Sequence, residues 1–171
     1  MLQRFKKIKI FVFDVDGVLT DGGLLVYDDG QMVRKMNIKD GYALQLALKR
    51  GYRILIISGG TSEAVRERLN RLGITEVYLR AHNKEEILTE YVATHNLSWS
   101  EILFMGDDIP DYTVMRKVGL SCAPADAAPE IKQLSTYISA MPGGYGCARD
   151  VIEKVLKLND DWPMDTTVAS K

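Results

Sequence analysis

The stretch FVFDVDGVLTDGG, residues 11–23, places three aspartates within eight residues, directly after an apolar run. That run and the residues before it predict a strand over residues 8–13 that is buried on both faces. Asp14 and Asp16 stand where this strand ends. The alternative interpretation of this aspartate pair is a solvated turn after the strand. The apolar run before the pair argues against it, because such a run predicts a buried strand. Because clustered buried carboxylates repel each other unless a cation is present, the stretch indicates a cation site.

Outward from this stretch, short apolar runs alternate with helical patterns. Further strands are predicted at residues 53–58, 76–79, 102–105 and 120–123. Helices are predicted at residues 40–50, 62–72, 83–95, 108–118, 128–134 and 147–158, with Asn83 and Glu86 forming a capping box. This alternation predicts an α/β fold, a doubly wound, Rossmann-like parallel sheet in one domain over residues 1–158.

Residues 24–38, LLVYDDGQMVRKMNI, interrupt this alternation. Asp29-Gly30 between two short strand patterns is a strong signal for a β-hairpin. The first of these strands is unusually apolar for an exposed hairpin, and an isolated two-stranded hairpin is marginal in water. We therefore expect the hairpin to pack on another subunit.

The composition is that of a globular protein of 171 residues with a formal net charge of −1, which makes nucleic acid an unexpected partner. No segment approaches the ~20 apolar residues that span a membrane, so we expect no membrane partner. Cys122 and Cys147 have no metal-binding or redox spacing, which favours a reducing, cytoplasmic location. Residues 159–171 are polar and patternless, and we expect a mobile tail unless a neighbouring surface holds it.

Polar residues follow four of the predicted strands. They are Asp14 and Asp16 after the first, Ser58-Gly59-Gly60 after the second, Lys84 soon after the third, and Gly106-Asp107-Asp108 with Asp111 after the fourth. Ligands of open α/β sheets bind beyond these carboxyl ends, so we expect the groups to share one rim. Carboxylates favour a hard cation, and we predict Mg²⁺ between Asp14 and Asp107.

A divalent cation, an ammonium group and a hydroxyl suit a phosphate dianion. Asp14 can then act as the nucleophile and form an aspartyl-phosphate. Asp16, two residues on in extended backbone, points to the same side and can protonate the leaving alcohol, then take a proton from water. Backbone donors near Gly17 and Gly59 can hold the phosphate oxygens.

These residues resemble the motifs of the haloacid dehalogenase superfamily of phosphatases. The resemblance rests on Asp14-Val15-Asp16, Ser58, Lys84 and the loop from Gly106 to Asp111, in the family's order and over nearly the whole chain. It implies that Mg²⁺ is held by the Asp14 side chain, the backbone carbonyl of Asp16, and Asp107. It also implies that Asp108 and Asp111 are ligands or supports.

Finer features resemble a small subclass that lacks a cap domain and acts on phosphorylated sugar acids. They are DVDGVLTDGG, the hairpin, NIKDGY at residues 37–42 and GGYGCARD at residues 143–150. The resemblance implies a homotetramer in which the hairpins build a central barrel and neighbours complete each active site. Independently, the short gaps between motifs leave no room for a lid domain.

The subclass implies 3-deoxy-D-manno-octulosonate 8-phosphate as the substrate, with 2-keto-3-deoxynonulosonate 9-phosphate or N-acylneuraminate 9-phosphate as alternatives. Lys39, Arg68 and Arg149 are candidate contacts to the substrate carboxylate, because guanidinium geometry matches a carboxylate. Gly60 and Tyr145 stand where some members carry basic residues.

A phosphate-responsive signalling module is the alternative from a different class, since receiver domains also place an aspartate, a Ser or Thr and a lysine on a parallel sheet. Their acidic metal pair precedes the phosphorylated aspartate, whereas here an acidic cluster follows Lys84. An idle assembly protein is disfavoured by the intact set of polar residues. A phosphomutase is disfavoured by the missing cap.

Overall fold

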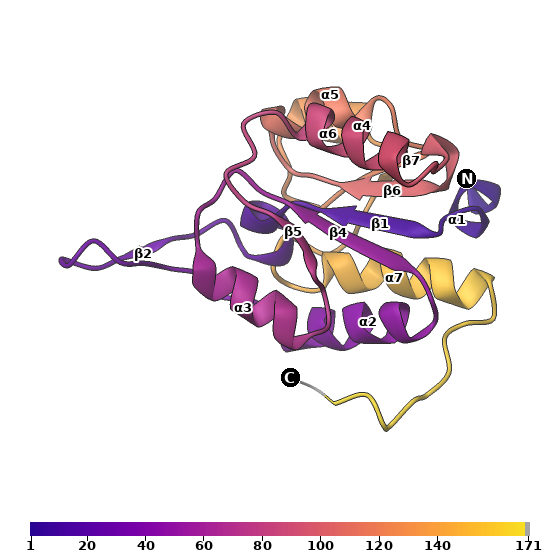
Figure 1. The fold of residues 1–171 in the computed structure, drawn as a ribbon, viewed down its shortest axis with the longest axis horizontal. Coiled ribbons are helices and arrows are strands. Elements are labelled where there is room, and N and C mark those ends of the chain that lie inside the picture. Colours follow the sequence, from indigo (N-terminus) through magenta and orange to yellow (C-terminus); the bar gives the residue numbers. More distant parts are fainter. Residues whose placement is uncertain (170–171) are drawn as a thin grey trace.

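The computed structural model describes residues 1–169, and its centre is a six-stranded sheet in the order β5-β4-β1-β6-β7-β8 (Figure 1). All neighbouring strands in it are parallel, as the sequence predicts. The strands are β1 (Ile10–Phe13), β4 (Arg53–Ile57), β5 (Glu76–Tyr78), β6 (Ile102–Met105), β7 (Leu120–Ala123) and β8 (Tyr137–Ile138). The two-residue edge strand β8 was not predicted, because so short a segment has no periodicity.

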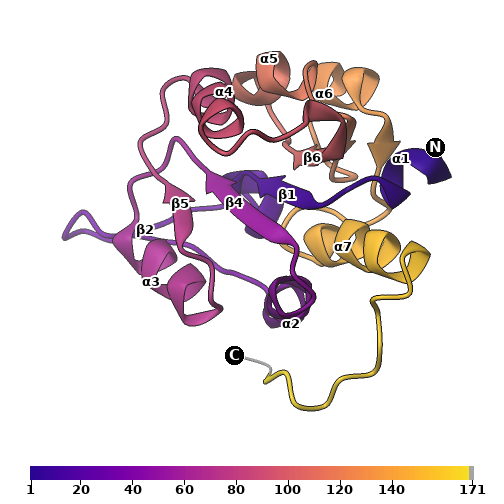
Figure 2. The same cartoon turned by 45° about the vertical axis from the view of Figure 1, so that its right-hand side comes forward.

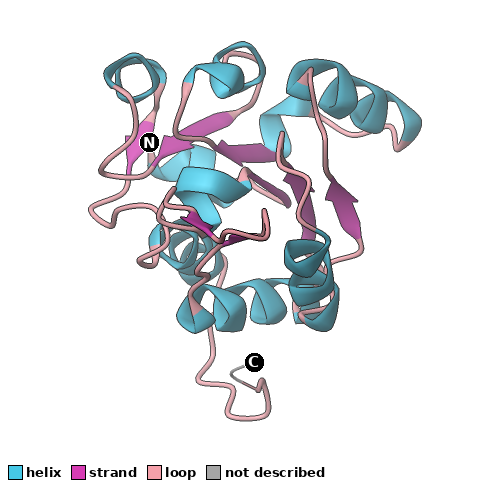
Figure 3. Ribbon diagram, turned by 90° about the vertical axis from the view of Figure 1, so that its left-hand side faces the viewer, coloured by secondary structure: helices cyan, strands magenta, loops and turns pink. Residues whose placement is uncertain are grey.

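Helices cover both faces of the sheet, which makes three layers (Figure 3). One face carries α2 (Ile38–Lys49), α3 (Glu63–Arg71) and α7 (Cys147–Leu158), and the other carries α4 (Lys84–Thr94), α5 (Tyr112–Met115) and α6 (Pro129–Leu134). Successive residues of β1 enter different cores: Phe11 and Phe13 pack on the α2 and α7 side, Ile10 and Val12 on the α4 side. This explains why β1 is apolar throughout.

Short helical segments complete the chain. They are α1 (Leu2–Lys6), which was not predicted, η1 (Val15–Leu19), η2 (Trp99–Glu101) and η3 (Ile109–Asp111). The predicted helix over residues 108–118 is instead η3 followed by the single turn of α5. Among residues 1–169, no helix has both the length and the apolar character that crossing a membrane requires.

The hairpin of residues 24–38 forms β2 (Leu25–Val26) and β3 (Met32–Val33), paired antiparallel, and it projects from the body of the molecule (Figure 1). Gly30 in its turn has φ of +84°, a conformation that favours glycine. Leu25 and Val26 are 64% and 67% exposed. A monomer therefore leaves an apolar surface in water, and the expected packing on another subunit stays a prediction.

The C-terminal segment returns beneath α2 (Figure 2). Lys49 of α2 forms an ion pair with Asp165 at 2.7 Å, and the Tyr42 hydroxyl donates to the Asp165 backbone carbonyl. Trp162 meets the Tyr42 ring edge-on. The surface that holds this segment is therefore α2 of the same chain. Residues 170 and 171, which belong to the predicted tail, lie outside the described residues.

Asp40 of α2 is buried at the N-terminus of α7, where its Oδ1 accepts the backbone N–H of Arg149 at 2.7 Å. Within residues 1–169 its Oδ2 has no hydrogen-bond partner. Burial raises the pKa of Asp40 from 3.8 to about 6. Because the folded state holds this proton more tightly, the contribution of Asp40 to stability is present below the unfolded pKa and is lost as pH rises through the folded one.

Asp40→Asn is therefore expected to remove the loss of stability that ionisation of Asp40 causes as the pH rises. The free energy of unfolding of the variant, relative to wild type, should rise by about 2 kcal/mol between about pH 4 and pH 7. Denaturant unfolding at several pH values measures it. Asp28→Asn, an exposed change on the hairpin, is the control and should show no such trend. A pH-independent difference for Asp40→Asn would contradict the interpretation.

Candidate active site

The carboxyl ends of β1, β4 and β6 open into a cavity of about 360 Å³. Parallel strands bring these ends to one edge of the sheet, as expected from the sequence. The predicted site residues that line the cavity are Asp14, Asp16, Ser58, Gly59, Lys84, Asp107 and Asp108. Segments far apart in the chain therefore deliver their polar groups to one place.

Asp14 is the first residue after β1, is buried, and lines this cavity. Its Oδ1 accepts the backbone N–H of Val15 at 2.6 Å, and its Oδ2 lies 2.7 Å from Lys84 Nζ. Burial, helped by the nearby Asp111 charge, raises the pKa of Asp14 to about 6, although Lys84 acts in the opposite direction. The carboxylate is thus held in place by two donors.

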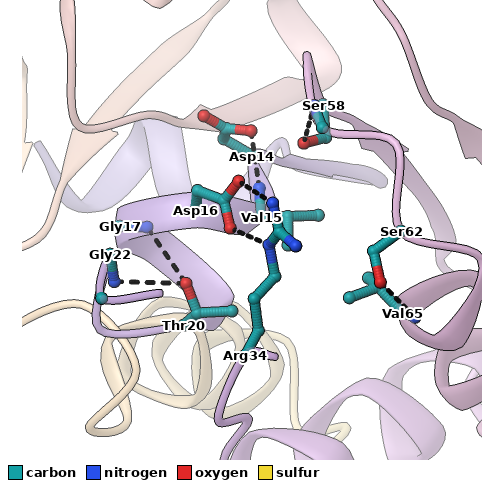
Figure 4. A network of polar contacts seen from close by, with 12 residues as sticks. Asp14, Val15, Asp16, Gly17, Thr20, Gly22, Arg34, Ser58, Ser62 and Val65 are labelled. Atoms are coloured by element: carbon teal, nitrogen blue, oxygen red, sulfur yellow. Dashed lines mark hydrogen bonds and ion pairs between the residues drawn. The ribbon is translucent and has the colours of Figure 1, made fainter. Parts of the chain in front are cut away.

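The loop after Asp14 turns sharply in η1, where Gly17 has φ of +86°. The Thr20 hydroxyl accepts the backbone N–H groups of Gly17 and Gly22, which closes the loop (Figure 4). A Cβ on Gly17 would lie 2.0 Å from Oδ2 of Asp107. Only glycine therefore allows the β1 loop and the β6 loop to approach so closely.

Lys84, the first residue of α4, is only 5% exposed in its side chain. Its Nζ lies 2.7 Å from both Asp14 Oδ2 and Asp111 Oδ1. Burial by itself would lower the pKa of Lys84, but the charges of Asp111 and Asp14 outweigh it and raise the pKa. Lys84 is therefore an ammonium ion fixed between two carboxylates.

Asp111, predicted as a support, is fully buried and uses both oxygens inside the protein. Oδ1 pairs with Lys84, and Oδ2 accepts the backbone N–H of Asp107 at 3.1 Å. A Cβ on Gly106 would lie 2.4 Å from the Asp111 carboxyl group, so this arrangement also requires a glycine. Asp108 is exposed, and its side chain caps η3 through the N–H of Ile109.

The donor set fits a divalent cation. Carboxylate oxygens of Asp14, Asp107 and Asp111 lie within 4.8 Å of one another, and Asp111 already binds Lys84 and the backbone of Asp107. Oδ1 of Asp107 is buried and has no hydrogen-bond partner among the described residues. Burial, with the charges of Asp14 and Asp111, raises the pKa of Asp107 to about 7. Lys84 cannot neutralise three carboxylates alone, and oxygen ligands of this kind suit Mg²⁺.

The Asp16 side chain makes a contact that was not predicted from the sequence. Arg34, just after β3, holds it through Nε to Oδ1 at 2.6 Å and Nη2 to Oδ2 at 3.1 Å (Figure 4). Next to it, Lys35 pairs with Asp21 at 2.9 Å. The sequence signal that could have predicted these two ion pairs is the presence of two adjacent basic residues at the base of the hairpin and two aspartates in the β1 loop.

Ser58, directly after β4, is buried, and its Oγ accepts the backbone N–H of Gly60 at 3.1 Å. The cap at the start of α3 is made by Ser62, whose hydroxyl accepts the N–H of Val65, so Ser58 does not serve as this cap. The Ser58 hydroxyl hydrogen can therefore point to a ligand in the cavity.

The predicted carboxylate contacts are not gathered at the Asp14 cavity. Lys39 and Arg149 line a separate cavity of about 560 Å³ beside α7. The Arg149 guanidinium lies over the rings of Tyr42 and Trp162 and pairs with Glu153. The sequence shows that Lys39 and Arg149 are basic, but it does not show in which direction their side chains extend from α2 and α7.

Arg68 lies elsewhere, in a cavity of about 450 Å³ between the hairpin and α3 that Arg34 also lines. Of the predicted substrate contacts, only Gly59 is at the Asp14 cavity itself. Gly143 and Gly144 allow close packing on the β1 loop: a Cβ on Gly143 would lie 2.0 Å from the backbone oxygen of Gly17, and a Cβ on Gly144 would lie 2.5 Å from the backbone nitrogen of Asp21.

Comparison with known proteins places the fold and site in context. A family model described as haloacid dehalogenase-like hydrolase matches residues 73–146. The chain is 32% identical over 160 residues to 3-deoxy-D-manno-octulosonate 8-phosphate phosphatase of Yersinia pestis, covering 94% of this chain and 86% of the relative. The crystal structure of that enzyme matches with a TM-score of 0.91.

Two further solved structures carry ions. The phosphatase of the same name from Moraxella catarrhalis, in complex with magnesium, phosphate and KDO, is 30% identical, with a TM-score of 0.89 and coverage of 92% of this chain and 90% of that one. The cobalt-bound Haemophilus influenzae enzyme is 27% identical, with a TM-score of 0.88 and coverage of 92% of both chains.

Proposed function

The chain belongs to the haloacid dehalogenase-like hydrolases, and on this premise we propose that it removes the phosphate from 3-deoxy-D-manno-octulosonate 8-phosphate. It is a phosphomonoester hydrolase that uses Mg²⁺. The identity of the sugar acid is the proposal. It is supported by the names of the relatives and by the KDO molecule in the Moraxella catarrhalis complex.

The observation that carries the proposed chemistry is the Asp14 carboxylate, held by Lys84 near Asp107, whose buried Oδ1 has no hydrogen-bond partner within residues 1–169. We propose that Asp14 attacks phosphorus, the ester bond breaks, and an aspartyl-phosphate forms. Asp16 gives a proton to the leaving alkoxide. It then takes a proton from the water that attacks the aspartyl-phosphate, which releases phosphate and regenerates Asp14.

The remaining polar groups stabilise the charge on the phosphate. Lys84 and the Ser58 hydroxyl can hold its oxygens, together with backbone N–H groups near Gly17 and Gly59. Asp14 and Asp107, with the backbone carbonyl of Asp16, would hold Mg²⁺, which when bound supplies the positive charge that lets a carboxylate approach a phosphate dianion.

A phosphate-release screen tests the substrate. Wild-type protein with Mg²⁺ is offered the octulosonate 8-phosphate, the nonulosonate 9-phosphate, N-acylneuraminate 9-phosphate and neutral sugar phosphates. We expect the highest kcat/KM for the octulosonate ester. If the enzyme prefers a nonulosonate ester, the octulosonate is the wrong sugar acid. If it prefers neutral sugar phosphates, the substrate is not a sugar acid.

Metal removal has a structural as well as a catalytic readout. EDTA is expected to stop phosphate release and Mg²⁺ to restore it. Because Asp14 and Asp107 repel each other without a cation, Mg²⁺ should also raise the melting temperature of the protein. Asp107→Asn should lose most of this thermal response, whereas Asp108→Asn, on the exposed neighbour, should keep it. Metal-independent turnover would contradict the assignment.

We further propose a homotetramer that forms through the hairpin. The support is the row of exposed apolar side chains on β2 and β3, which are Leu25, Val26, Met32 and Val33. Val26→Asp is expected to shift the protein to smaller species in sedimentation velocity. Asp28→Asn on the same hairpin is the control. A wild-type monomer that is fully active would contradict the proposal.

The cytoplasmic location expected from the sequence also stays a proposal. Cys122 and Cys147 are both buried free thiols. Thiols in this state need no oxidising compartment.

A further inference from the structure

Arg34 is the residue through which the base of the hairpin reaches the catalytic loop. Its side chain is 10% exposed, which is low for an arginine beside an exposed hairpin. Its Nε and Nη2 donate to the two oxygens of Asp16, at 2.6 and 3.1 Å. Figure 4 shows the guanidinium group extending from the hairpin to Asp16, with Ser58 beyond.

The missing side chain at Gly60 makes room for this contact. A Cβ there would lie 3.3 Å from Ser58 Oγ, 3.4 Å from Asp16 Oδ2 and 3.5 Å from Arg34 Nη2. A long side chain at this position would therefore compete with the guanidinium for the same space. Arg34 therefore supplies a positive charge directly beside Asp16, which lines the Asp14 cavity.

The Arg34–Asp16 pair stands between two cavities. Asp16 and Gly60 line the cavity that holds Asp14. Arg34 lines the cavity of about 450 Å³ between the hairpin and α3, where Arg68 is a second guanidinium group. A substrate whose phosphate reaches Asp14 can extend past this pair, so that its far end meets Arg34.

The pair fixes the direction of the Asp16 side chain. Both carboxylate oxygens accept hydrogen bonds from Arg34, so the Asp16 carboxylate is held on the guanidinium fork. A substrate carboxylate has the same geometry as the Asp16 side chain and can take its place on the guanidinium fork. No covalent bond changes in this exchange, and Asp16 is released toward the ester oxygen.

We propose that Arg34 determines the preference of the enzyme for phosphate esters that also carry a carboxylate, by exchanging Asp16 for that carboxylate. A neutral sugar phosphate cannot make the exchange and leaves Asp16 paired. The inference rests on the proposed function, in which Asp16 is the proton donor. The inference adds to that function the residue that binds the carboxylate of the substrate.

Steady-state kinetics of Arg34→Gln and Lys35→Gln tests this. Lys35→Gln removes the adjacent ion pair, with Asp21, and leaves Asp16 untouched. Three substrates are compared: the octulosonate 8-phosphate, its neutral carboxamide, and p-nitrophenyl phosphate, whose leaving group needs no proton. Wild type and Lys35→Gln should prefer the acid to the amide.

In Arg34→Gln, kcat/KM for the acid should fall roughly 10- to 100-fold, while KM for the acid rises and the amide is unchanged or faster. Turnover of p-nitrophenyl phosphate should stay within about twofold, since it needs neither Arg34 nor proton donation. Arg34→Lys should restore only part of the preference, because a lysine has no fork.

Two outcomes would overturn the inference: an acid-to-amide ratio that survives in Arg34→Gln, or an equal fall for all three substrates. A wild-type enzyme that hydrolyses no octulosonate ester would instead reject the proposed substrate. The Arg34 inference is then decided with 6-phosphogluconate and glucose 6-phosphate, of which only the first carries a carboxylate. It fails if Arg34→Gln leaves the ratio of these two unchanged.

Discussion

Asp14→Asn is expected to abolish phosphate release and leave the fold intact. The amide has the shape of the carboxylate, and its oxygen can still accept the backbone N–H of Val15. It cannot attack phosphorus as a carboxylate does, so kcat should fall by about 10⁴-fold or more. Lys84 keeps its second partner, Asp111, and one charge leaves a crowded acidic cluster.

Single-turnover phosphate release and thermal unfolding measure the two parts of this prediction. The matched control is Asp108→Asn, the same substitution on an exposed carboxylate of the next loop, which should keep kcat within about tenfold of wild type. Trapping of a phosphorylated protein in wild type and its absence in Asp14→Asn would identify the nucleophile. Substantial turnover by Asp14→Asn would exclude Asp14 from that role.

Lys84→Met is expected to damage both stability and activity. The methionine has a similar length but no charge, so it leaves Asp14 and Asp111 facing each other in a buried site. Breaking a buried ion pair on one side costs about 3–5 kcal/mol, because the remaining charges stay desolvated. Loss of the ammonium group beside the phosphate should lower kcat/KM by about 10³-fold.

Denaturant unfolding with and without Mg²⁺ measures the first effect, and part of the lost stability should return with the cation. Lys117→Met is the control, because Lys117 pairs with Glu85 at the surface and should contribute less than about 1 kcal/mol. Adding Asp111→Asn to Lys84→Met should recover stability but not activity. A Lys84→Met variant as stable as wild type would show that this charge network is not what holds the site.

Local pattern was enough to predict the core of the fold. The β1 residues are apolar on both faces because each face packs against helices, and this also makes the run readable in the sequence. Caps such as Asn83 on the N–H of Glu86 depend on neighbours within one turn, so they too were predicted. Once a parallel sheet is inferred, Asp14, Ser58, Lys84 and Asp107 must meet at its carboxyl edge.

Contacts that depend on how separate segments meet could not be predicted in this way. The sequence by itself determined the parallel sheet, the rim and the residues on it. Only the tertiary structure decided that Arg34 pairs with Asp16, that Lys39 and Arg149 face a different cavity, and that Asp165 lies on α2. The physical reason is that periodicity reports which face of an element is buried, whereas an ion pair between distant residues depends on the direction of each side chain and on the space its neighbours leave.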